Sequence, residues 1–320
     1  MTRSEAAAFL MSRDHFCILT HRRPDGDTIG SAVALCRGLR QMGKQAHILE
    51  NPEITVRYVW LPEGLTKKQP EAGDTLVCVD TAARNMLPDA FAPWRDEIVL
   101  RIDHHGTAQS FTPFELVDAG AGACGEIIWD ILTQMELTLD EPIATALYVA
   151  ISTDTGCFRF SNTTAHTFQA AAACAAAGAP VYDLNQALFE TVSIARLRMQ
   201  GWMAEHSKML QGGAVTICAI PKTVEEELGV SEDDMDNISS FLRTFEGVKV
   251  AALLREADDR IKLSIRAMPG HDAGAVCALF GGGGHKAAAG ASIKMPLAEA
   301  EKAVTKAILD MAAENGQECL

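Results

Sequence analysis

The stretch HFCILTHRRPDGDTIGSAVALCRGLRQMG, residues 15–43, decides the predicted fold of the first half of the chain. It opens with a short apolar run typical of a buried strand and passes through a loop rich in glycine and charge. Apolar residues at helical spacing then follow from 29 to 43, and QAHILE at 45–50 is predicted as the next strand. Strand, loop, helix and strand form the repeating unit of a parallel α/β sheet, so we predict an α/β fold.

The loop HRRPDGDTIGS places a histidine and two aspartates at the end of the first predicted strand. His21, Asp25 and Asp27 offer one nitrogen and two carboxylate donors, a set that suits Mn²⁺ or Mg²⁺ better than a sulfur-preferring ion. The same residue types also suit an Asx-turn and a helix N-cap, in which a carboxylate accepts hydrogen bonds from backbone N–H groups. Taken alone, the loop leaves both interpretations open.

Two further apolar segments end in residues of the same kind. DTLVCVDTA contains Asp80, and DEIVLRIDHH ends with Asp103, His104 and His105. Ligands of open α/β sheets gather at the carboxyl ends of the strands, so we expect these side chains to converge with the first loop. Adjacent side chains on a strand point to opposite sides, so His104 and His105 are predicted to have different roles. The alternative is a set of polar strand ends that only contact solvent.

Helical patterns follow at 125–136, 141–152 and 164–177. The motif STDTGCFRFSNT lies between the last two and carries a further carboxylate, Asp154. It also carries Arg159, whose guanidinium is a candidate for pairing with a phosphate. The alternative is a loop with an exposed arginine.

The second half of the chain has a different pattern, which indicates a separate domain. Residues 183–210 are continuously amphipathic and are predicted as a helical connector. The elements expected beyond it are a strand at 213–220, a helix at 231–245 with a serine N-cap, a hairpin at 248–268, a helix at 272–280, a strand at 290–295 and a helix at 297–314. The predicted organisation is a domain over 1–185, a helical linker over 186–210 and a smaller α/β domain over 211–320.

The glycine run in GGGGHKAAAG is the candidate anion site of this second domain. Backbone N–H groups of Gly282, Gly283 and Gly284 can approach an anion closely, and His285 adds a donor. Arg266, at the end of the KLSIR strand, is a second basic candidate. Glycine runs also occur in flexible linkers, but this one lies between a predicted helix and a predicted strand, which favours a tight functional turn.

Composition excludes several classes of protein. The formal net charge is −14, which makes the chain a poor partner for long duplex DNA because phosphate contacts need lysine and arginine. None of the nine cysteines forms a CxxC pair, so we predict reduced thiols in a cytoplasmic protein and no zinc-thiolate site. The N-terminus is too short and interrupted for a signal peptide, and no apolar run reaches membrane-spanning length, so no membrane association is expected.

Five motifs in this order carry a resemblance to a known family: HRRPDGDTIGS, VCVDT, RIDHHG, STDTGCFRFSNT and GGGGHKAAAG. The chain resembles the DHH phosphoesterases, and the glycine-rich motif resembles their DHHA1-type second domain. The resemblance covers residues 21–290, and in size and domain pairing it is strongest to the nano-RNase and pAp phosphatase branch. It implies an N-terminal parallel-sheet DHH domain joined to a smaller DHHA1 domain.

The resemblance also implies a site for two Mn²⁺ ions, with Mg²⁺ as the alternative metal. Carried over by position, His21, Asp25 and Asp80 hold one ion, and Asp27, Asp80, His104 and Asp154 hold the other. Asp103 would then orient a histidine ring, and His105 would lie near the scissile phosphate. Four carboxylates cannot crowd together in ionised form without compensation, and two divalent cations supply it.

The resemblance implies hydrolysis of short oligoribonucleotides to mononucleotides and of 3′-phosphoadenosine 5′-phosphate (pAp) to AMP, by two-metal activation of water. Arg159, Arg266, Gly282–Gly284 and His285 are the expected substrate contacts. A cyclic or linear dinucleotide phosphodiesterase acting on c-di-AMP or pApA is the alternative within the family, and a non-catalytic nucleotide-binding module is the alternative outside it. The apolar early helices would also suit a homodimer.

Overall fold

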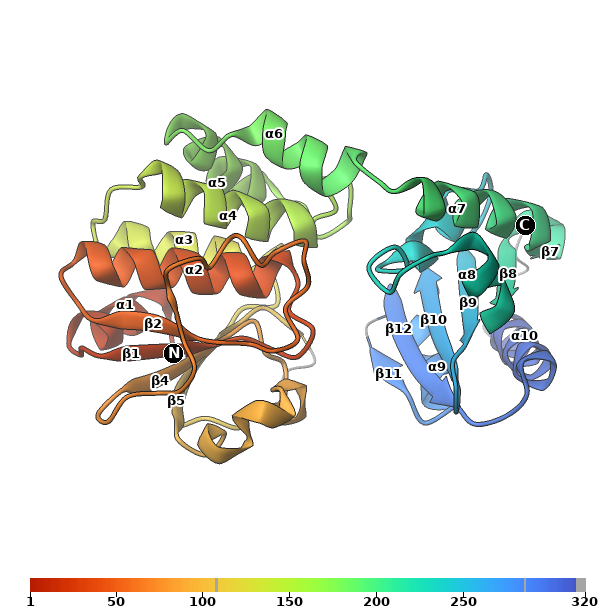
Figure 1. The fold of residues 1–320 in the computed structure, drawn as a ribbon, viewed down its shortest axis with the longest axis horizontal. Helices are drawn as coiled ribbons and strands as arrows, with labels where there is room; N and C mark the ends of the chain where they lie inside the picture. The colour runs from red at the N-terminus through yellow and green to blue at the C-terminus, as the bar shows by residue number, and fades with distance from the viewer. Residues whose placement is uncertain (107–108, 285, 315–320) are drawn as a thin grey trace. The chain divides into compact units, whose positions relative to one another are not determined.

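The computed structural model describes residues 1–106, 109–284 and 286–314 (Figure 1). The chain divides into two compact units, Met1–Thr191 and Val192–Leu320. His285, one of the predicted anion-binding residues, lies outside the described residues. Within the part of the chain that the structure describes, no helix is both long enough and apolar enough to cross a membrane.

The first unit is built on a six-stranded sheet in the order β3-β2-β1-β4-β5-β6, whose neighbouring strands pair in parallel. Its strands are β1 Phe16–Leu19, β2 Ala46–Leu49, β3 Thr66–Lys67, β4 Thr75–Val79, β5 Ile98–Asp103 and β6 Phe114–Val117. The predicted parallel α/β sheet is therefore confirmed. Because β1, β4 and β5 are neighbours, the polar residues that follow them lie at one edge of the sheet.

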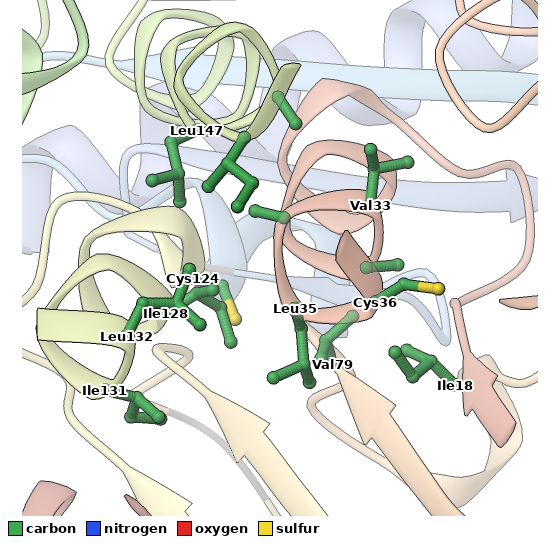
Figure 2. Close-up of a cluster of buried hydrophobic side chains, with 14 of the residues drawn as sticks. Ile18, Val33, Leu35, Cys36, Val79, Cys124, Ile128, Ile131, Leu132 and Leu147 are labelled. Atoms are coloured by element: carbon green, nitrogen blue, oxygen red, sulfur yellow. The ribbon is translucent and has the colours of Figure 1, made fainter. Parts of the chain in front are cut away.

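Helices cover the sheet and form most of the core of this unit. They are α1 Arg3–Met11, α2 Gly26–Gln41, α3 Cys124–Gln134, α4 Glu141–Asp154, α5 Ala165–Ala176 and α6 Val181–Asn185, with 3₁₀ turns η1 Arg84–Met86 and η2 Asp89–Trp94. Figure 2 shows buried side chains of α2, α3 and α4, among them Val33, Ile128 and Leu147, above Ile18 and Val79 of the strands. Helix α2 approaches α4 so closely that a Cβ at Gly30 would lie 2.4 Å from the Ala146 carbonyl oxygen.

Helix α2 begins three residues before the predicted start at 29, so the loop is shorter than expected. Asp25 is the N-cap, and its Oδ1 accepts hydrogen bonds from the N–H groups of Asp27 and Thr28, both at 3.1 Å. The two hydrogen bonds of this cap offset the poor helix propensity of Gly26 in the first turn. Asp27 therefore projects from a helix rather than from a flexible turn.

The connector predicted as helical over 183–210 is helical only in parts. After α6 comes a π-helical turn, Gln186–Glu190, and then extended backbone at Thr191 and Ser193. A new helix, α7 Ile194–His206, starts when the Ser193 hydroxyl accepts from the Arg196 N–H at 2.9 Å, and strand β7 Lys208–Leu210 follows. The Ser193 cap and the β-branched residues Thr191 and Val192 before it separate two helical segments, although the amphipathic sequence pattern runs through both.

The second unit is built on a sheet in the order β11-β12-β10-β9-β8-β7, in which β8 and β9 pair in parallel. Its further elements are β8 Val215–Ile220, α8 Lys222–Leu228, β9 Val250–Glu256, β10 Ile261–Ala267, α9 Ala273–Ala278, β11 Gly283–Gly284, β12 Ala288–Ile293 and α10 Leu297–Glu314. The predicted hairpin is confirmed, since β9 and β10 pair antiparallel and the Ala257 N–H donates to the Arg260 carbonyl at 2.8 Å.

The helix predicted at 231–245 is wrong. Ser231 does form a local cap, because its Oγ accepts from the Asp234 N–H at 3.2 Å. The segment nevertheless forms successive turns, and Asn237 adopts a left-handed backbone with φ +49° before a 3₁₀ helix, η5 Ile238–Thr244. A residue in the left-handed conformation cannot continue an α-helix, so the turn capped by Ser231 does not extend into one.

Candidate metal centre

Acidic and histidine side chains converge at the carboxyl ends of β1, β4 and β5, beside the first turn of α2 and the end of α4. His21 follows β1, Asp80 follows β4 directly, and Asp103 is the last residue of β5. Asp27 lies in the first turn of α2, and Asp154 is the last residue of α4. The sheet order therefore brings together residues that are far apart in the sequence.

A first group of possible ligands consists of His21, Asp25 and Asp80. The Nε2 atom of His21 lies 3.6 Å from Asp25 Oδ1 and 3.5 Å from Asp80 Oδ2. The other ring nitrogen, Nδ1, is 2.7 Å from the Arg22 carbonyl oxygen. A proton on Nδ1 donates to this carbonyl and leaves Nε2 as the nitrogen that faces the carboxylates.

A second group consists of Asp27, His104 and Asp154, again with Asp80. The Nε2 atom of His104 lies 3.6 Å from Asp27 Oδ2, 3.5 Å from Asp80 Oδ1 and 3.6 Å from Asp154 Oδ2. Its Nδ1 atom is 3.2 Å from the Ala121 carbonyl oxygen. This histidine is therefore oriented in the same way as His21.

Asp80 is the residue that joins the two groups. Its Oδ2 faces His21 and its Oδ1 faces His104, at 3.5 Å in each case. The residue is 2 % exposed, and Oδ1 makes no hydrogen bond to any residue that the structure describes. Its backbone is left-handed, with φ +52°, a conformation that costs free energy in a residue with a Cβ. A buried, strained carboxylate with an unsatisfied oxygen suits a position between two cations.

The ligand candidates are held by further hydrogen bonds. Asp27 accepts from the N–H groups of Cys124 at 2.7 Å and Gly125 at 2.9 Å, which belong to the first turn of α3, and from the Ser31 hydroxyl at 3.1 Å. The Asn162 amide donates to Asp154 Oδ2 at 3.3 Å. Asp25 also remains the N-cap of α2, so the cap interpretation of the loop is confirmed and the ligand role of Asp25 is compatible with it.

Asp103 lies behind the cluster and holds the neighbouring histidine. Its Oδ1 is 2.7 Å from His105 Nδ1 and also accepts from the His104 N–H at 2.9 Å. Asp103 is fully buried, and its pKa is lowered because the His105 hydrogen bond and charge outweigh the opposing effect of burial. This geometry fits the expected role of Asp103 in orienting a ring.

Sequence reasoning missed Arg101, which is 1 % exposed although it lies in the middle of β5. Its guanidinium donates to the carbonyls of Ala82 at 3.0 Å and Gln109 at 2.9 Å and pairs with Glu115 at 3.1 Å. It also lies 3.8 Å from Asp103 Oδ2. The signal was present in the sequence, since an arginine interrupts the apolar run of IVLRID.

The pKa values of the cluster show an excess of negative charge. Burial raises the pKa of Asp154 to about 7; His104 opposes this shift, and the carboxylates of Asp80 and Asp25 add to it. Burial lowers the pKa of His104, but Asp80, Asp27 and Asp154 outweigh it and raise that pKa to about 9. Without metal the cluster must take up protons, whereas divalent cations would replace them.

The residues present therefore fit a pair of hard divalent cations. With neutral histidines the six side chains carry four carboxylates and a charge of −4, which two divalent cations balance. Carboxylate oxygens and imidazole nitrogens, without a thiolate among them, are the donor set that Mn²⁺ and Mg²⁺ accept.

The remaining candidates lie elsewhere. Arg159 is exposed, and its Nε donates to the Gly156 carbonyl at 2.7 Å. Arg266 lies on β10 of the second unit, where its Nη2 donates to Asn237 Oδ1 at 3.2 Å. Gly283 and Gly284 form the exposed edge strand β11, paired with β12. The glycine run is thus the end of a sheet rather than a free loop.

Family comparisons agree with this arrangement. The DHH family, N-terminal domain, matches residues 15–151, and the DHHA1 domain matches residues 212–314. A bifunctional oligoribonuclease and PAP phosphatase NrnA from Thermus thermophilus is 32 % identical over 296 residues, which cover 91 % of this chain and 88 % of the relative. The chain belongs to the DHH family.

Solved structures share the fold of this DHH protein. An exopolyphosphatase-related protein from Bacteroides fragilis has a TM-score of 0.89 at 20 % identity, covering 98 % of this chain and 97 % of that one. RecJ from Thermus thermophilus, in complex with Mn²⁺, has a TM-score of 0.53 at 15 % identity, covering 98 % of this chain and 55 % of that one. With the family shown, this DHH protein is a metal-dependent hydrolytic phosphoesterase.

Proposed function

We propose that this DHH protein hydrolyses short oligoribonucleotides to mononucleotides and pAp to AMP, using two Mn²⁺ ions, with Mg²⁺ as the alternative. The observation that carries the proposal is Asp80, whose two oxygens face two separate groups of ligands. The similarity to an oligoribonuclease and PAP phosphatase over most of both chains supports the choice of substrates.

His21, Asp25 and Asp80 would hold one ion, and Asp27, Asp80, His104 and Asp154 the other. When bound, two such ions would supply an activated water and charge neutralisation for phosphoryl transfer. The protein's own part is to fix its ligands before metal binds, through the backbone contacts of His21, Asp27 and His104. Asp103 holds His105 at the rim of the site, where its ring would contact the scissile phosphate.

The second unit would bind the far end of the substrate. Burial lowers the pKa of Arg266, and the neighbouring Arg243 lowers it further, so this pair of guanidiniums favours an anion between them. The exposed edge formed by Gly283 and Gly284 would add backbone donors, and Gly282 and His285 remain contacts predicted from the sequence. Arg159 would add a contact from the first unit.

The net charge of −14 favours a short substrate bound at one site over a long strand that needs an extended basic surface. We place the enzyme in the cytoplasm, because the eight cysteines that the structure describes are all free thiols. A homodimer stays a prediction.

A substrate panel tests the proposal. The enzyme, treated with EDTA and reloaded with Mn²⁺, is assayed on pAp, RNA dimers to pentamers, linear pApA and c-di-AMP. We expect the highest kcat/KM values for pAp and the RNA oligomers and no turnover in EDTA. Preference for c-di-AMP or pApA would replace the proposal with the dinucleotide phosphodiesterase, and Mn²⁺-independent turnover would contradict the metal centre.

A further inference from the structure

A second cluster of possible metal ligands lies in the first unit, at the opposite end of the sheet from the candidate metal centre of His21, Asp25, Asp27, Asp80, His104 and Asp154, hereafter the DHH centre. Cys17, His47 and Asp74 each offer a ligand atom, and these atoms all lie within 4.8 Å of one another. Cys17 lies in β1 and is the register partner of His47 in β2, while Asp74 directly precedes β4. Cys17 precedes His21 by four residues, about 13 Å along an extended strand, so the two clusters are separate.

The three side chains are buried together, and Asp74 Oδ2 accepts a hydrogen bond from the Glu71 N–H at 2.6 Å. Cys17 is 0 % and His47 is 3 % exposed, and the Asp74 side chain is 2 % exposed. Nε2 of His47 lies 3.5 Å from Asp74 Oδ2 but makes no hydrogen bond to any residue within the described ranges. Buried imidazole nitrogens are normally paired, so one that is aimed at a carboxylate beside a thiol, without a hydrogen bond, indicates a ligand atom.

The donor set selects the kind of ion. One thiolate, one imidazole and one carboxylate suit Zn²⁺ or a similar borderline-soft cation, whereas Mn²⁺ and Mg²⁺ prefer oxygen. Three protein ligands leave a fourth tetrahedral position for water.

Two charged residues also face His47. Lys67 and Glu71 pair with each other at 2.6 Å, so the positive charge of the lysine is largely offset.

Although the cysteine spacing predicted no zinc-thiolate site, we propose that Cys17, His47 and Asp74 form a Zn²⁺ site that ties β1, β2 and the start of β4 together. Binding would replace the proton of the Cys17 thiol, so the ion is taken up with release of one proton. The ion would join the amino-terminal ends of strands whose carboxyl ends carry residues of the candidate metal centre.

Cobalt spectroscopy tests the site without relying on activity. The reduced full-length protein is treated with EDTA, saturated with Mn²⁺ and titrated with Co²⁺, while thiolate-to-cobalt charge-transfer absorption is recorded in the near ultraviolet. No thiol lies among the ligands of the DHH centre, so this band reports only the proposed site. We expect it to saturate at one equivalent and to be displaced by Zn²⁺.

Three variants decide the assignment. The band should be lost in Cys17→Ser. In His47→Gln the affinity for Co²⁺, measured from the same band, should fall at least tenfold. Cys78→Ser is the control and should leave the band unchanged, because Cys78 is an equally buried cysteine on the neighbouring strand β4. Near-ultraviolet circular dichroism checks that each variant folds. If Cys17→Ser does not fold, the result for His47→Gln decides whether the proposed site exists. Absence of the band in the wild type, or its persistence at full strength in a folded Cys17→Ser or His47→Gln variant, would overturn the proposal.

Discussion

The two units differ in how firmly their polar groups are held. In the first unit His21, Asp27 and His104 are each fixed by backbone contacts, and Asp103 fixes His105. In the second unit the glycine donors of β11 are exposed at a sheet edge, and Arg266 is half-buried. A metal centre needs ligands at defined positions before the ion arrives, whereas an anion site needs donors left open for the substrate. The comparison predicts that changes in the first unit act on kcat and changes in the second act on KM.

The largest expected effect is that of Asp80→Asn. Asp80 faces both ligand groups, and a neutral amide would hold divalent cations far less well than its carboxylate, so we expect kcat/KM for pAp to fall by on the order of 10³-fold or more. Steady-state kinetics with saturating Mn²⁺ measures the loss. Asp258→Asn, which changes an exposed aspartate in the β9–β10 turn, is the matched control. Activity of Asp80→Asn within tenfold of the wild type would remove this residue from the centre.

Asp103→Asn should have a smaller effect, because Asp103 acts through His105 rather than on the substrate. We expect kcat to fall by about 10–100-fold, the usual cost of losing a residue that orients a ligand or catalytic ring. KM should stay close to that of the wild type, and Asp103→Glu should restore part of the activity. A rise in KM with unchanged kcat would show that the residue contributes to binding instead.

Arg266→Ala tests the second unit. Loss of a charged hydrogen bond to a substrate phosphate should raise KM about tenfold, while kcat changes by no more than about threefold. Lys262→Ala is the control, since this lysine lies on the same strand and pairs with Glu232 at 3.4 Å. If kcat falls in Arg266→Ala as strongly as in Asp103→Asn, the division of roles between the units is wrong.

The smallest expected effect is on the pH dependence of stability in the metal-free protein. The pKa of Asp154 is raised from 3.8 to about 7 and that of His104 from 6.5 to about 9, so the folded state binds more protons than the unfolded state across this range. The free energy of unfolding of the EDTA-treated chain should therefore fall as the pH rises from 5 to 9. Urea unfolding measures it, and the fall between pH 5 and 7 should shrink in Asp154→Asn. A urea midpoint of unfolding that rises between pH 5 and 9 would contradict the assigned pKa shifts of Asp154 and His104.

Much of the DHH centre was predictable because its residues mark the ends of strands. Asp80 and Asp103 follow apolar runs that are recognisable without any knowledge of the fold. The course of the segments 183–210 and 231–245 was not predictable. In the first, the amphipathic pattern does not reveal that the helix ends before Thr191. In the second, the serine cap marks a helix start but does not reveal that Asn237 interrupts the helix.

The sequence by itself determined the parallel α/β sheet, the family and the six residues that gather at its carboxyl edge. Only the tertiary structure decided that Arg101 is buried beside Asp103 and that Cys17, His47 and Asp74 meet at the opposite end of the sheet. The physical reason is the strand order, which makes β2 and β4 the two neighbours of β1. Strand ends are local properties of the chain, but which side chains face one another depends on pairing between segments that are far apart in sequence.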